Sequence, residues 1–147
     1  MEHLAYLLAD CARMLRRDFD ERVRPLGVTG QQARLLFLLE RSEGDNQSAY
    51  AAQLEVEPIT LCRMVDRMED SGLISRRPDP DDRRARRLFL TPRACDMIRD
   101  LYERALGLSD NMASALTKEE LANLESSLKK IHVHIQEVRE QGNVING

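Results

Sequence analysis

The chain has 147 residues, of which 32% are charged and only 4% aromatic. This length suits one domain, and the composition is typical of a largely helical protein. The apolar run at residues 35–39 is too short to span a membrane, and the opening residues 1–3 lack the basic segment of a secretion signal. We therefore expect a cytoplasmic protein with no membrane partner.

Charge is distributed unevenly along the chain. The net charge of −3 by itself argues against a nucleic-acid ligand. Seven arginines nevertheless lie between Arg76 and Arg93, against three aspartates, so this window carries 7 − 3 = +4. Such a local cationic stripe can bind phosphate, because screening makes distant acidic groups count for little. A solvated charged loop is the alternative interpretation.

The residues with reactive side chains form no catalytic pattern. Cys11, Cys62 and Cys95 are widely spaced, which argues against a disulfide framework or a zinc site, and we interpret them as buried core thiols. The sequence shows no Ser-His-Asp or Cys-His arrangement, no glycine-rich phosphate loop and no metal-ligand cluster. We expect neither an enzyme nor a cofactor.

The first half of the chain predicts three helices. Apolar residues recur every three or four positions from Leu4 and Leu8 to Val23, which indicates an amphipathic helix. Residues 33–40 are apolar on nearly all sides and are predicted to form a buried helix. Residues 48–54 form a short helix, and a turn at residues 55–58 leads to the next one.

The helix after this turn has two distinct faces. It is predicted to bury Leu61, Met64, Val65 and Met68, and to expose Ile59, Thr60, Arg63 and Arg67. Thr60 and Ile59 at its N-terminal end suit a base edge and a thymine methyl group, and Arg63 suits a base or a phosphate. Arg67, one turn later, is predicted to contact a phosphate or to pair with a neighbouring aspartate.

The next segment predicts a β-hairpin with a cationic tip. Residues 73–77 and 87–90 are the strands, the turn between them carries Arg83, Arg84 and Arg86, and Arg87 begins the second strand. One arginine at such a tip can enter a narrow minor groove. Asp82, two residues before Arg84, is placed to brace that guanidinium. A groove-entering helix followed by a cationic hairpin is what a winged helix-turn-helix needs to hold duplex DNA.

The C-terminal part predicts two long helices, which begin at Thr91-Pro92 and at a capping box over residues 117–120. In the last helix, apolar residues spaced by three and four form a heptad seam: Leu121, Leu124, Leu128, Ile131, Ile135 and Val138. Together with Leu4 and Leu8, this seam predicts a homodimer built from both chain ends. The alternative is an antiparallel pair of helices within one chain. A two-fold dimer would place its recognition helices on the half-sites of a near-palindromic operator.

Residues 63–76 and the wing from Asp82 to Thr91 resemble the multiple antibiotic resistance regulator (MarR) family, and most closely its SlyA-like branch. Helix order and length are similar over nearly the whole chain. The resemblance implies a mainly α fold with a small β-hairpin wing. Residues 29–92 would form the winged helix-turn-helix, and residues 1–28 and 93–147 a helical dimerisation region of the same continuous domain.

The resemblance also implies a function. The chain would be a homodimeric transcriptional regulator that represses from near-palindromic operators, with an aromatic or phenolic small molecule as the class of effector. By position, Arg63 corresponds to the family's recognition-helix arginine, and Asp82 with Arg84 to its wing-tip pair. Glu55 replaces a glycine that is common in the family, which predicts a mildly strained turn with positive φ.

Two other functions remain open on the sequence. The helical seam can bind a different protein, with the arginine-rich turn serving only as soluble surface. Alternatively, Cys11 or Cys62 acts as the thiol of a redox-sensing regulator. The family's peroxide-sensing branch carries a tyrosine before the second helix, whereas residues 29–32 of this chain contain none, which makes thiol sensing the weaker interpretation.

Overall fold

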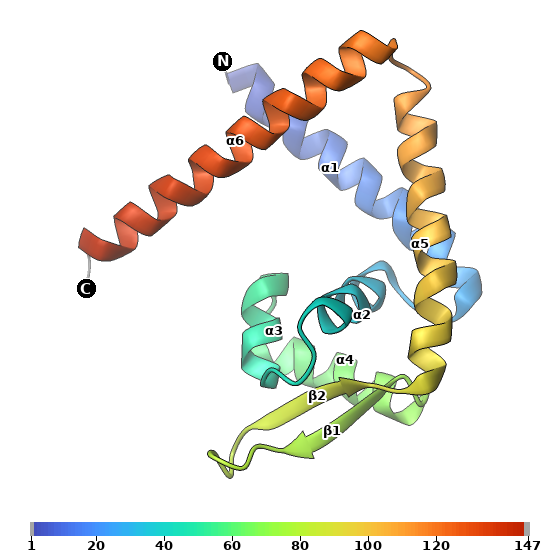
Figure 1. The fold of residues 1–147 in the computed structure, drawn as a ribbon, viewed down its shortest axis with the longest axis vertical. Helices are drawn as coiled ribbons and strands as arrows, with labels where there is room; N and C mark the ends of the chain where they lie inside the picture. The colour runs from blue at the N-terminus through green and yellow to red at the C-terminus, as the bar shows by residue number, and fades with distance from the viewer. Residues whose placement is uncertain (1, 146–147) are drawn as a thin grey trace. The chain divides into compact units, whose positions relative to one another are not determined.

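The computed structural model describes residues 2–145. Figure 1 shows its elements in chain order: α1 (Glu2–Val23), the 3-10 helix η1 (Arg24–Leu26), α2 (Gly30–Arg41), α3 (Gln47–Leu54), α4 (Pro58–Asp70), β1 (Ile74–Pro78), β2 (Arg86–Leu90), α5 (Pro92–Ala113) and α6 (Lys118–Ile145). This confirms a mainly α fold with a small β-hairpin. The chain divides into two compact units, residues 1–108 and 109–147. The ends of the predicted helical region, residues 1 and 146–147, lie outside the described residues.

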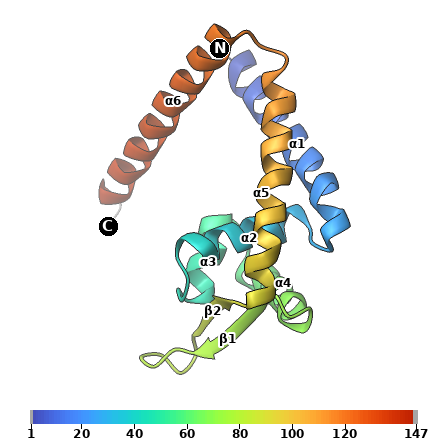
Figure 2. The ribbon, with the colours of Figure 1, turned by 45° about the vertical axis from the view of Figure 1, so that its right-hand side comes forward.

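The core of the first unit joins the recognition helix to the hairpin. Residues from α1, α2, α3, α4, both strands and α5 share one buried apolar cluster, whose largest fully buried members are Tyr50, Leu35, Leu36, Leu39, Leu61, Met68, Ile74, Leu88, Leu101, Val23 and Val65. Burying an aliphatic side chain of this size contributes about 1.5–3 kcal/mol. The helix α4 and the wing are therefore held on a common core. Figure 2 shows these two elements from a second side.

Side chains accept hydrogen bonds from the backbone N–H groups at the start of α2. Thr29 Oγ1 accepts the backbone N–H of Gln32 at 3.1 Å, and Gln32 Oε1 accepts the backbone N–H of Thr29 at 3.0 Å, which makes a capping box. Asp20 reaches from α1 to accept the backbone N–H of Gly30 at 2.8 Å. This bond and the neighbouring Arg24 lower the pKa of the Asp20 carboxyl.

The turn between α3 and α4 has the strained residue expected from the sequence. Asn46 caps α3 by accepting the backbone N–H of Ala49 at 2.9 Å, and Glu55 ends the helix with a φ of 54°. The left-handed region costs a non-glycine residue about 1–2 kcal/mol. Pro58 then begins α4, as predicted.

The second unit contains the end of α5 and all of α6. The predicted capping box is present, because Thr117 Oγ1 accepts the N–H of Glu120 at 3.2 Å and the Glu120 carboxylate accepts the N–H of Thr117 at 2.8 Å. An apolar hollow of about 400 Å³ is lined by residues that include Met112, Leu124 and Leu128. The seam residues from Leu124 to Val138 are 38–54% exposed, so this apolar face is uncovered in the single chain.

The prediction of buried cysteines is wrong. Cys11 and Cys95 are exposed, and Cys62 is only partly buried. Cys11 belongs to the apolar stripe of α1, whose N-terminal members such as Leu4 are themselves exposed in the single chain. Cys95 directly follows the buried Ala94, and the helical period turns it away from the core.

Candidate nucleic-acid interface

The outward face of α4 carries the residues predicted to read DNA. Ile59, Thr60, Arg63 and Arg67 are all exposed, while Leu61, Val65 and Met68 are buried on the opposite face. Ile59 is 60% exposed, which is unusual for a large apolar side chain at the start of a helix. The separation into a buried and an exposed face agrees with the pattern in the sequence, except that Met64 is only partly buried.

A shallow hollow lies between the start of α2 and the outward face of α4. Its volume is about 270 Å³, and its lining residues are Thr29, Gln32, Thr60, Arg63, Met64 and Arg67. Thr29 and Gln32 were not expected near α4, because their pattern in the sequence signals only a helix cap. The hollow places neutral hydrogen-bonding groups beside two guanidinium groups.

The hairpin is anchored at its base by the loop between α2 and α3. The strands pair antiparallel, with Ile74 opposite Leu90 and Pro78 opposite Arg86. Beyond them, the backbone N–H of Gly44 donates to the Leu88 carbonyl at 2.9 Å. The Glu43 carboxylate accepts the N–H of Leu90 at 2.7 Å. The loop thus lies along the outer edge of β2 and is hydrogen-bonded to it.

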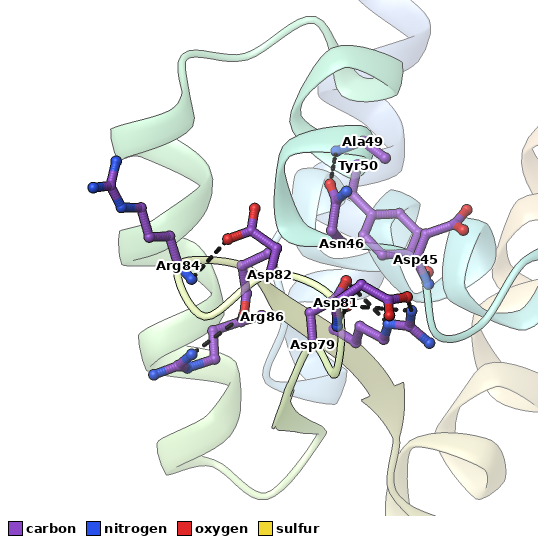
Figure 3. Close-up of polar contacts among 11 residues, drawn as sticks. Asp45, Asn46, Ala49, Tyr50, Asp79, Asp81, Asp82, Arg84 and Arg86 are labelled. Carbon is purple, nitrogen blue, oxygen red and sulfur yellow. Dashed lines mark hydrogen bonds and ion pairs between the residues drawn. The ribbon is translucent and has the colours of Figure 1, made fainter.

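A buried tyrosine fixes this anchoring loop. The Tyr50 hydroxyl donates to the carbonyl of Ser42 and accepts the backbone N–H of Asp45 at 3.2 Å. Figure 3 shows Tyr50 and Asn46 side by side. Burial raises the pKa of Tyr50, so its hydroxyl keeps its proton and both bonds at neutral pH.

Most of the arginines in the cationic window are held by other groups. Arg77 stacks on the ring of Phe89 with 4.0 Å from the guanidinium carbon to the ring centroid. Arg87 pairs with Asp79 at 3.2 Å. The backbone N–H of Asp81, followed by the hydrogen bond from Arg87, lowers the pKa of Asp79. The remaining contacts go to backbone carbonyls: Arg86 donates to Arg83 and Ala85, and Arg93 to Ser71.

Arg76 is the most extensively bonded of these arginines. Its side chain is only 18% exposed. Nη1 pairs with Asp66 Oδ1 at 2.5 Å, Nη2 donates to the Cys62 carbonyl at 3.1 Å, and Nε donates to Gln47 Oε1 at 3.3 Å. Burial lowers the pKa of Arg76, but the hydrogen bond and charge of Asp66 outweigh burial and raise it overall.

The two arginines at the tip are free. Among the described residues, neither Arg83 nor Arg84 has a side-chain bond or ion pair. The expectation that Asp82 braces the Arg84 guanidinium is wrong, because Asp82 Oδ1 instead accepts the backbone N–H of Arg84 at 2.9 Å. In Figure 3 the Arg84 side chain points away from Asp82. A short aspartate side chain closes its own turn more readily than it reaches a long neighbour.

The alternative for Arg67, an ion pair with an aspartate of its own helix, is not observed. Asp66 binds Arg76 instead. Over residues 3–142, where side chains are described, Arg63 and Arg67 form no ion pair. In the same part of the chain, no group of three His, Cys, Asp or Glu residues is placed to hold a metal ion. No described helix is long and apolar enough to cross a bilayer.

Comparison with known proteins agrees with this geometry. The MarR family model matches residues 28–85, which hold α2 to β1 and the hairpin turn. Wild-type MarR from E. coli in its apo form is 26% identical, with a TM-score of 0.82 over 87% of this chain and 95% of that one.

Two similar structures contain DNA. The transcriptional repressor CouR, bound to a 23-mer DNA duplex, is 28% identical, with a TM-score of 0.77 over 88% of this chain and 92% of that one. A mutant E. coli MarR complexed with operator DNA is 26% identical, with a TM-score of 0.76 over 87% of this chain and 92% of that one. The narrower SlyA-like assignment stays a prediction. Residues 28–85 are thus similar to the MarR family of transcriptional regulators, and the fold over most of the chain is similar to those of MarR and CouR.

Proposed function

We propose that this regulator binds duplex DNA with α4 in the major groove and the hairpin tip in the adjacent minor groove. One observation carries the proposal. Within the described residues of α4 and the hairpin, four guanidinium groups have no bond to another group, those of Arg63, Arg67, Arg83 and Arg84. Free guanidinium groups on the two elements that a winged helix presents to DNA can neutralise phosphates.

The proposed contacts differ in kind. Ile59 and Thr60 meet base edges, and Arg63 reads a base or binds a phosphate. Arg67 binds a phosphate, and Arg84 enters the minor groove with Arg83 beside it on the backbone. Arg86, Arg87 and Asp82 shape the hairpin, because their side chains are already bonded within it.

The proposed form on DNA is a homodimer that acts as a repressor. The uncovered seam on α6 and the exposed Leu4 on α1 support dimerisation, since contiguous exposed apolar patches mark interfaces. CouR is a repressor with DNA bound, and the E. coli mutant was bound to operator DNA. A chain that reads chromosomal DNA would also work in the cytoplasm, and no catalytic activity is proposed.

The test selects DNA without assuming an operator. The full chain is incubated with a random duplex pool, and bound duplexes are recovered and sequenced, while light scattering gives the mass in solution. We expect inverted repeats whose half-sites lie about 10 bp apart, centre to centre, and a mass twice 16.9 kDa. No enrichment, together with a partner protein bound to the seam, would favour the helical interaction protein instead.

The effector class is a separate part of the proposal. Three aromatic rings from α1, α2 and α5 meet in the first unit. The ring centroids of Phe19 and Phe37 are 6.3 Å apart, and those of Phe37 and Tyr102 are 4.7 Å apart. The Tyr102 hydroxyl donates to Glu40 at 2.6 Å. This cluster suits an aromatic or phenolic molecule. A panel of such compounds should release the selected duplex from the unaltered chain but not from Phe37→Ala.

A further inference from the structure

The outward side of α4 carries charges of both signs. Arg63 and Arg67 share it with Asp66, Glu69 and Asp70, so its own charge is 2 − 3 = −1. Residues three or four apart on a helix face each other. Asp66 follows Arg63 by three positions and is therefore its natural partner. Such a pair would neutralise the guanidinium proposed to contact DNA and would place a carboxylate near the phosphates.

The structure shows a different pairing. Asp66 turns to Arg76 on β1, at 2.5 Å, and Glu69 also faces Arg76. Glu69 Oε2 accepts the Arg76 backbone N–H at 3.1 Å, and its other oxygen lies 3.6 Å from Nη1. Arg76 thus pairs with two of the three carboxylates on α4 and its single charge offsets one of them, while Arg63 has no ion pair among the described residues.

The guanidinium group of Arg76 forms hydrogen bonds on several sides. In addition to the carboxylates, it donates to the Cys62 carbonyl and to Gln47 of α3. These acceptors come from two helices and lie around one planar group that is largely shielded from water. A lysine has no such fork and satisfies fewer of these acceptors at once. The side chain is therefore held as part of the scaffold and is not available to DNA.

We propose that Arg76 is a positioning residue for DNA binding, which keeps Asp66 away from Arg63 and so leaves the Arg63 guanidinium of α4 free for phosphate. This inference rests on the proposed function. It assigns Arg76, one of the seven arginines of the cationic window, a role without DNA contact. It also explains how a helix with an excess of carboxylates can face a polyanion.

The test is a double-mutant cycle on the full chain. The variants are Arg76→Met, Asp66→Asn and the combination, with Asp100→Asn on α5 as a control that neutralises an exposed carboxylate elsewhere. The probe is a duplex recovered by selection with the unaltered chain, and fluorescence anisotropy gives its affinity over a salt series. Thermal unfolding of each variant is measured in parallel.

Arg76→Met should weaken binding about tenfold, as expected when one DNA-contacting arginine is neutralised. It should also reduce the salt slope, which is the slope of the logarithm of the binding constant against the logarithm of the salt concentration. The reduction should be about 0.9 for each phosphate that is no longer neutralised. Adding Asp66→Asn should return the affinity to within about threefold of the unaltered chain, because the released carboxylate is gone. Asp66→Asn alone should bind at least as tightly as the unaltered chain, and Asp100→Asn should bind equally.

Several results would overturn the inference. An unchanged DNA affinity for Arg76→Met would show that Arg76 has no role in DNA binding. A double variant that binds as weakly as Arg76→Met would mean that Arg76 acts by contacting DNA or by stabilising the fold. If Arg76→Met does not fold, Asp66→Asn decides, since weaker binding by this variant contradicts the proposal. If the unaltered chain selects no duplex, the proposed function fails and this inference fails with it.

Discussion

The arginines of the hairpin differ in what lies opposite their guanidinium groups. Arg87 faces Asp79 across the turn, so its charge is paired, whereas Arg77 keeps its charge but is held on the Phe89 ring. Arg83 and Arg84 stand at the tip, where no described side chain reaches them. The charge available to a phosphate is therefore concentrated at the tip, although the arginines are spread over the whole hairpin.

Arg84 gives the most direct test of this concentration. Arg84→Ala should weaken binding to the selected duplex about tenfold, and the salt slope should fall by about 0.9 for each phosphate that the variant leaves unneutralised. Arg99→Ala, an exposed arginine on α5, is the matched control and should change neither quantity. Anisotropy over a salt series measures both. If the slope of Arg84→Ala equals that of the unaltered chain, the tip neutralises no phosphate.

Asp20 makes the stability of the first unit depend on pH. The N–H of Gly30 and then Arg24 lower the pKa of its carboxyl. A carboxyl whose pKa is lower in the folded state adds stability above its unfolded pKa of about 4, and this stability is lost as the pH falls through the folded pKa. Asp20→Asn should therefore be less stable than the unaltered chain at neutral pH, and the difference should shrink below about pH 4.

Urea unfolding at a series of pH values measures this difference. Asp18→Asn, an exposed neighbour on α1, serves as the control and should leave the free energy of unfolding nearly unchanged at every pH. A gap for Asp20→Asn that stays constant down to acid pH would show that the charge of the carboxylate does not stabilise the start of α2.

At the scale of elements, the predictions that hold come from local signals. The period of three and four identifies α4, Pro58 marks its start, and Thr117 with Glu120 marks the start of α6. Each signal lies within a few residues of the feature that it predicts. The strained turn at Glu55 could be predicted for the same reason.

The contacts that position the wing could not be predicted in this way. Glu43 bonds Leu90 from a distant part of the sequence, and Arg76 joins β1 to residues of two helices. No local pattern marks such partners. Asp82 was expected beside the Arg84 guanidinium only because it is close in sequence, whereas the tight turn uses it for a backbone N–H.

Tyr50 tests whether the loop between α2 and α3 supports the wing. Tyr50→Phe removes two hydrogen bonds of a buried hydroxyl and should lower the free energy of unfolding by about 1–3 kcal/mol. The amides of β2 should also exchange faster with solvent, because the loop that pairs with that strand is released. Tyr102→Phe, whose hydroxyl bonds Glu40 on the surface, is the matched control and should cost less than about 0.5 kcal/mol.

Urea unfolding and hydrogen exchange give the two readouts for Tyr50→Phe. Loss of stability without faster exchange in β2 would mean that the hydroxyl supports the core but not the wing. Equal losses for Tyr50→Phe and Tyr102→Phe would contradict the special role of the buried hydroxyl.

At the scale of the whole molecule, each unit keeps an apolar surface of its own. In the first unit, Leu4, Tyr6 and Leu7 of α1 are exposed, and in the second unit the seam of α6 runs beside an apolar hollow. Soluble monomers rarely expose such continuous apolar faces. The same uncovered stripe explains why Cys11 is exposed although its position in the pattern is apolar.

The seam of α6 therefore gives the last prediction. Leu128→Asp places a charge in the middle of the heptad pattern, where burial of an unpaired carboxylate is costly, and should shift the mass from the dimer toward 16.9 kDa. Ser126→Asp adds the same charge on the other side of the helix and should leave the dimer intact. Light scattering measures the mass, and circular dichroism shows that both variants remain helical.

Dissociation should affect DNA binding in a specific way. Two linked reading heads gain affinity because the second half-site is bound at high effective concentration. Leu128→Asp should thus bind the full inverted repeat much more weakly than the unaltered chain does, while both bind an isolated half-site about equally. A dimer that survives Leu128→Asp would show that the α6 seam does not hold the two chains together. Loss of half-site binding would instead mean that the substitution had damaged the reading head itself.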